Sequence, residues 1–125
     1  MKNVISMDER LPKSGSRAIS VRDRRYAIRF PFAADVTLID LESGATADGV
    51  TSDISFGGCF VCTSKPLAVK SRVRATLTRK DQKVEALAVV RAVKPRIGMG
   101  LEFLDVEQAS YGILERWIDQ IKRSR

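Results

Sequence analysis

Two short groups of residues in this sequence have the chemistry to hold an anionic ligand. The first is the run Arg22, Arg24, Arg25 and Arg29. Clustered guanidinium groups favour nucleic acids, nucleotides, phosphates or acidic lipids. The second is the segment 53–58 (Asp-Ile-Ser-Phe-Gly-Gly), which puts a carboxylate and a hydroxyl two residues apart and so on one face of a strand, before a glycine turn. Taken singly, each group has an ordinary alternative, a solvated basic segment or a set of turn-forming residues.

The charge of the chain is uneven. The formal net charge is +7, and residues 1–29 hold eight basic and three acidic residues. Residues 1–21 are poor in periodic apolar positions and contain a polar turn-forming cluster at 12–16, so we predict a flexible basic N-terminal arm. Charge alone leaves two interpretations open, a soluble tail and an anion-binding segment.

Catalysis has no positive signal in the sequence. There is no histidine, which removes the commonest general base and metal ligand. Nucleophile-elbow and Walker motifs are absent, and the acidic residues are scattered singly. Cys59 and Cys62 cannot complete a tetrahedral zinc site, and in a strand they would face opposite sides. We therefore expect a protein that is not an enzyme, with no metal or cofactor and with two small strand cysteines in a reducing cytosol.

The rest of the pattern predicts a mainly β fold in a single domain of residues 22–123. Six short runs with strand character precede one amphipathic segment, which suggests a small six-stranded antiparallel barrel with a C-terminal α-helix. The predicted strands span 33–41, 46–55, 59–63, 72–79, 83–94 and 97–103. The helix stripe comprises Ile113, Leu114, Trp117, Ile118 and Ile121, and its apolar face should cover the barrel.

Local signals refine these elements. Asp105 and Gln108 have the spacing of a capping box, so we expect Asp105 to cap the helix. Ile97 should point inward with Met99, Leu101 and Phe103, as the first residue of the alternating last strand. No run is apolar enough to span a bilayer and no signal-peptide core is visible, so we expect a soluble, cytoplasmic protein.

The order Arg25-x-x-x-Arg29 followed by Asp53-x-Ser55-x-x-Gly58 resembles the signature of bacterial PilZ domains. The resemblance spans residues 22–123 and includes the Gly-Met-Gly-Leu-Glu-Phe stretch at 98–103 and the C-terminal helix. It implies a stand-alone receptor for the second messenger cyclic di-GMP, which signals to a downstream protein.

The resemblance also implies a role for each residue. Arg25 and Arg29 would clamp phosphate and guanine groups, since a guanidinium can bind a phosphate or the O6 and N7 edge of guanine. Asp53 and Ser55 would read the guanine, and Gly58 would allow a tight turn or a close backbone approach. An arginine immediately before the first motif arginine, here Arg24, is similar to members that bind two molecules of cyclic di-GMP.

The implied mechanism is a folding of the arginine segment across the barrel when the ligand neutralises its charge. Two alternatives remain at this point: a basic small-barrel module that binds nucleic acid through Arg72, Arg74 and Arg79, and a PilZ-like adaptor that binds no ligand. The downstream partner, the process regulated (motility, exopolysaccharide synthesis or transcription) and the oligomeric state are not encoded in these motifs.

Overall fold

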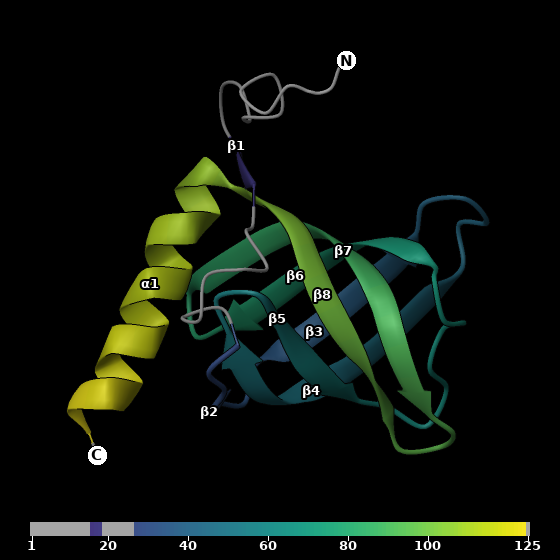
Figure 1. The fold of residues 1–125 in the computed structure, drawn as a ribbon, viewed down its shortest axis with the longest axis horizontal. Helices are drawn as coiled ribbons and strands as arrows, with labels where there is room; N and C mark the ends of the chain where they lie inside the picture. The colour runs from purple at the N-terminus through teal and green to yellow at the C-terminus, as the bar shows by residue number, and fades with distance from the viewer. Residues whose placement is uncertain (1–15, 19–26, 125) are drawn as a thin grey trace.

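The predicted six-stranded barrel is present in the computed structural model, which describes residues 16–18 and 27–124. Six antiparallel strands form one closed sheet (Figure 1). Around the barrel their order is β8, β5, β4, β3, β6 and β7, and the pairing of β7 with β8 closes it. Their bounds are β3 (Asp35–Asp40), β4 (Thr46–Ser55), β5 (Gly58–Cys62), β6 (Arg72–Arg79), β7 (Gln82–Lys94) and β8 (Gly98–Glu107).

Two short strands extend this barrel. β1 (Ser16–Ala18) pairs with the end of β8, and β2 (Phe30–Pro31) pairs with the end of β4. β1 falls within residues 1–21, for which the sequence predicts a flexible arm; the other residues of that segment lie outside the described part of the chain. β2 is important for the site because it directly follows Arg29.

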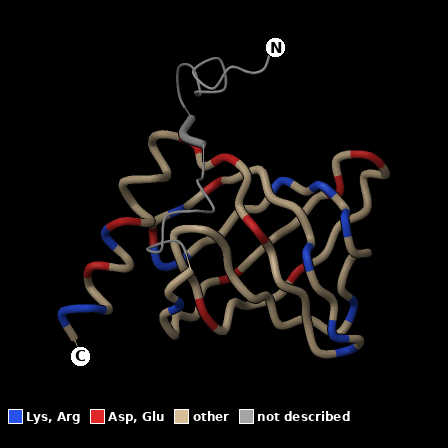
Figure 2. The backbone as a smooth tube through the Cα atoms, viewed as in Figure 1, with Lys and Arg blue, Asp and Glu red and all other residues tan. Residues whose placement is uncertain are grey.

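The strands alternate between the barrel interior and solvent, as the sequence pattern predicts. In β6 the side chains of Val73, Ala75 and Leu77 are fully buried, whereas Arg72 and Arg74 are exposed. The other strands contribute buried residues in the same way, so the core is continuous across the barrel. Basic and acidic residues are interspersed over the strands outside this core (Figure 2).

Helix α1 (Gln108–Arg123) lies across one end of the barrel, where it buries Leu114, Trp117 and Ile118 (Figure 1). The predicted apolar stripe is therefore confirmed as a core-facing stripe. Lys122 and Arg123 stand in its last turn, where cations are favoured by the helix dipole. No helix among the described residues is long and apolar enough to cross a membrane.

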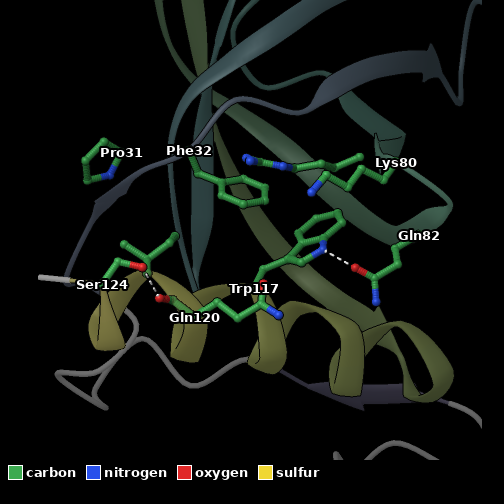
Figure 3. A pocket seen from close by; sticks show the side chains of 9 residues that line it. Pro31, Phe32, Lys80, Gln82, Trp117, Gln120 and Ser124 are labelled. Atoms are coloured by element: carbon green, nitrogen blue, oxygen red, sulfur yellow. Dashed lines mark hydrogen bonds between the residues drawn. The ribbon is translucent and has the colours of Figure 1, made fainter.

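The Trp117 side chain anchors the helix. Its indole Nε1 donates a hydrogen bond to Oε1 of Gln82, over 2.9 Å, and its ring centroid lies 4.9 Å from that of Phe32. These three side chains line a hollow of roughly 320 Å³ between the helix and the turn that joins β6 to β7 (Figure 3). Arg79, at the end of β6, and Lys80, in that turn, also line the hollow.

Two local predictions are wrong. Asp105 does not cap the helix: it lies within β8, opposite Leu87, and the N-cap position belongs to Glu107 without a side-chain hydrogen bond. Strand pairing with β7 and β1 extends β8 past the capping signal, because a ladder of tertiary hydrogen bonds outweighs one cap. Ile97 is 60% exposed, because it lies in the connection before β8 and the inward alternation starts at Met99.

A substitution at Trp117 tests this account of the helix. Trp117→Phe removes the hydrogen bond to Gln82 and part of a buried ring, so we expect a loss of about 1–3 kcal/mol in the free energy of unfolding. Urea unfolding would measure it as a lower midpoint with an unchanged slope. Ile97→Ala, at an exposed position, should unfold like the wild type, and a Trp117→Phe curve that matched the wild type would refute the anchoring role.

Candidate functional site

The two motif halves meet at one ion pair. Arg29 Nη1 lies 2.5 Å from Oδ1 of Asp53, although the residues are 24 positions apart in the chain. The side chains are 48% and 29% exposed, so both remain open to a ligand. Arg24 and Arg25 lie outside the described residues, and the structure does not test their predicted roles.

Residues 30–34 hold Arg29 in this place by running alongside β4. Phe30 pairs with Ile54 and Pro31 with Asp53, which puts Arg29 at the end of the short ladder. The buried hydroxyl of Thr51 then fixes the following residues: it donates to the Phe32 carbonyl over 2.6 Å and accepts from the Ala34 amide over 2.9 Å. Thr51 was not among the residues predicted for the site, although a hydroxyl at an inward position of an alternating strand is a recognisable signal.

A β-bulge sets the direction of Asp53. The register of β4 against β5 shifts between Thr51 and Asp53, and such a bulge turns the residues that follow it. Asp53 then stands opposite Phe60 on the outer surface of the barrel, while Ile54 is fully buried. The Ser52 hydroxyl donates to the second carboxylate oxygen of Asp53 over 3.2 Å and steadies it.

Ser55 and Gly58 shape the hairpin beside the ion pair. The Ser55 hydroxyl accepts from the Gly57 amide over 3.1 Å and donates to the Gly58 carbonyl over 3.3 Å, so it stabilises the turn. A Cβ at Gly58 would lie 2.0 Å from the Leu101 carbonyl oxygen. Of the two roles expected for Gly58, the structure shows the close backbone approach, here between β5 and β8.

A second ion pair on the outer surface was not singled out from the sequence. Arg91 on β7 contacts Glu102 on β8, and Glu102 stands opposite Gly58. The outer face of β4, β5, β8 and β7 therefore carries two half-exposed arginine–carboxylate pairs. Both arginine side chains are about half exposed, so an anion can reach them.

Arg72, Arg74 and Arg79 of β6, which were expected to form one basic face, point to two different places. Arg72 and Arg74 point outward, and Arg74 lies 3.6 Å from Glu107. Arg79 instead lies with its guanidinium 4.4 Å from the Phe32 ring centroid and donates to the Ala33 carbonyl. The three arginines thus do not form one surface, because position 79 has the opposite strand parity and closes over the hollow by the helix.

The cysteines have the strand positions that the sequence predicts. Cys59 is fully buried and Cys62 is exposed, on opposite sides of β5. Burial raises the pKa of the Cys59 thiol to about 12, so this thiol stays protonated at neutral pH.

Removing the Thr51 hydroxyl tests the positioning of the site. Thr51→Val keeps the shape of the side chain but leaves the Phe32 carbonyl and the Ala34 amide without this partner. We expect the free energy of unfolding to fall by about 1–3 kcal/mol. Urea unfolding would measure it, with Thr37→Val on the exposed face of β3 as the matched control. Equal losses in both variants would contradict the positioning role.

Comparisons with known proteins agree with this architecture. The family model "PilZ domain" matches residues 23–120. The inhibitor of motility MotI/DgrA of Bacillus subtilis is similar in structure, with a TM-score of 0.64 and 18% identity over 78% of this chain. This chain covers 51% of that protein, about half of its length. The PilZ domain of CeSA from a cellulose-synthesising bacterium gives a TM-score of 0.60 and 20% identity, covering 76% of this chain and 98% of that domain.

No curated protein gives a significant match. The two similar structures share the fold of this chain at low sequence identity. The family is established by the family model, which matches most of the chain. The model spans the site described above, from the segment before Arg29 through Asp53 and Gly58 to helix α1. This chain belongs to the PilZ domain family.

Proposed function

We propose that this protein is a receptor for cyclic di-GMP that passes the signal to another protein and catalyses no reaction. The observation that carries the proposal is the contact between Arg29 and Asp53 on the outer barrel surface. It brings together, from distant parts of the chain, one cation and one carboxylate that match two different parts of the ligand.

The ligand offers two phosphates and two guanine bases. A guanidinium such as that of Arg29 can bind a phosphate oxygen pair or the O6 and N7 edge of guanine. The Asp53 carboxylate can accept the N1 and N2 protons of guanine, a function that a site for phosphate alone would not need. When the ligand binds, the ion pair between Arg29 and Asp53 is replaced by contacts of each residue with the ligand. The exchange costs little, since such exposed ion pairs contribute only about 0–1 kcal/mol.

Arg24 and Arg25 complete the proposed site from the segment that precedes Arg29. Arg25 would act with Arg29 as the second clamp, and Arg24 would offset the charge of a second, intercalated ligand molecule. Ser55 was expected to read the guanine with Asp53, but its buried hydroxyl already bonds within the hairpin. Ser55 and Gly58 are therefore proposed to hold the turn against which the guanine lies. In this proposal the segment closes over the barrel when the ligand neutralises its arginines.

The remodelled surface would then be recognised by a partner protein in the cytoplasm. β2 could transmit a conformational change from the ligand site to the region beside α1, because Pro31 pairs with Asp53 and also lines the hollow beside that helix (Figure 3). The similar structures come from an inhibitor of motility and from a cellulose-synthesising bacterium. Motility and exopolysaccharide synthesis are therefore the first outputs to examine.

Binding to nucleic acid is the less favoured alternative. Arg72 and Arg74 offer exposed charge, but Arg74 lies near Glu107, and Arg79 stacks on Phe32 away from them. Nucleic-acid binding should depend steeply on salt and should not depend on Asp53.

Isothermal titration calorimetry with cyclic di-GMP tests the proposed function, with GTP as the control ligand. We expect saturable binding at micromolar or tighter affinity, two ligand molecules per chain, and no binding of GTP. One ligand per chain would contradict the role of Arg24 but not the receptor. An absence of binding would contradict the receptor itself.

Arginine variants test the residue assignments. Arg25→Ala and Arg29→Ala should each weaken binding about thirty- to a hundredfold, since each loses a charge-assisted contact of on the order of 2–3 kcal/mol. The matched control is Arg74→Ala, which removes a half-exposed, ion-paired arginine from β6. Calorimetry should give wild-type affinity for that control. Wild-type affinity in Arg29→Ala would refute the assignment of the clamp.

A further inference from the structure

Phe60 is the neighbour of Asp53 on the adjacent strand, and no role in ligand binding has been assigned to it so far. It faces outward on β5, between the fully buried Cys59 and Val61, and its side chain is partly exposed. In the strand register it stands opposite Asp53 on one side and Gly100 on the other. Directly opposed residues have Cβ atoms about 4.5–5.5 Å apart, so Phe60 and Asp53 are neighbours on the outer surface of the barrel.

Two glycines of β8 leave room for this ring. A Cβ at Gly98 would lie 2.6 and 2.9 Å from the Cε2 and Cζ atoms of Phe60, and one at Gly100 would lie 4.0 Å from Cδ1. The ring therefore rests against the bare backbone of β8 from Gly100 to Gly98. Because Phe60 is partly exposed, part of the ring surface is available to a ligand.

Lys94 adds a cation to the same place. Its ammonium nitrogen lies 5.5 Å from the Phe60 ring centroid, within the range of a cation–π contact. Neighbouring positions on the surface thus supply a cation, a carboxylate, an aromatic ring and a second cation, from Arg29, Asp53, Phe60 and Lys94. A purine nucleotide offers a partner for each kind of group: its phosphates for the cations, the hydrogen-bonding edge of its base for the carboxylate, and the face of its base for the ring.

We propose that Phe60 and Lys94 form a stacking subsite for a purine base, next to the Asp53 carboxylate. This inference rests on the proposed function and adds the surface that binds the face of the base. The base lies on the Phe60 ring while Asp53 accepts hydrogen bonds from its edge, and the Lys94 ammonium turns from the ring to a ligand phosphate. Stacking on an aromatic side chain is a strong and sequence-tolerant contribution to nucleotide binding.

Calorimetric titration of variants with cyclic di-GMP tests the subsite. Phe60→Leu should weaken binding about tenfold, because it keeps apolar bulk but loses the π surface, whereas Phe60→Trp should retain wild-type affinity. Val50→Ala is the matched control, since Val50 is an exposed apolar residue of β4 that stands opposite Cys62 instead of Phe60. Circular dichroism and urea unfolding would confirm that each variant is folded.

The charge is tested separately with Lys94→Met, which keeps the aliphatic stem. We expect about three- to tenfold weaker binding and a smaller dependence of affinity on salt, as for the loss of one phosphate contact. Binding by the wild type with unchanged affinity in Phe60→Leu would overturn the subsite and leave the receptor standing. Failure of the wild type to bind would instead contradict the proposed function.

Discussion

The pairing of β2 with the end of β4 is the constraint on which the site depends. Without it, Arg29 would have no fixed relation to Asp53, since 24 residues of chain separate them. The pairing is short, and the buried hydroxyl of Thr51 secures it by bonding to both sides of the Phe32–Ala34 segment. The buried Thr51 hydroxyl therefore helps to determine where the charged group of Arg29 lies on the outside of the barrel. Its burial is tolerated because both of its hydrogen bonds are made.

Glycine has a complementary role on the other side of the site. Gly58 lets the backbones of β5 and β8 approach each other, and Gly98 and Gly100 leave the outer surface of β8 bare beneath Phe60. A side chain at Gly58 or Gly98 would collide with backbone oxygen atoms, so these positions are limited by the barrel as well as by any ligand. The outer surface of β4, β5 and β8 thus places an aromatic ring on bare backbone beside charged side chains, which suits a planar nucleotide.

The sequence predicted the barrel, the helix and the meeting of the two motifs because these depend on periodic patterns and on a resemblance. It failed where distant pairing decides the outcome. The capping signal at Asp105 was wrong because β8 continues through it. Arg79 lies apart from the predicted basic face because position 79 has the opposite strand parity to 72 and 74, and its guanidinium there stacks on the distant Phe32. The inward position of the Thr51 hydroxyl can be recognised in the sequence, but its partners Phe32 and Ala34 depend on how their segment runs beside β4. The support of Phe60 by β8 depends on cross-strand register, which one sequence does not show.

The central claim is that a guanine nucleotide binds to the outer surface of β4, β5 and β8. Amide chemical-shift mapping during titration with cyclic di-GMP tests it most directly, because each backbone amide reports its own surroundings. The account predicts that the largest shifts fall on residues 53–60 and 98–102, together with Arg29. Shifts confined to the outer face of β6, or to the hollow around Trp117, would contradict it.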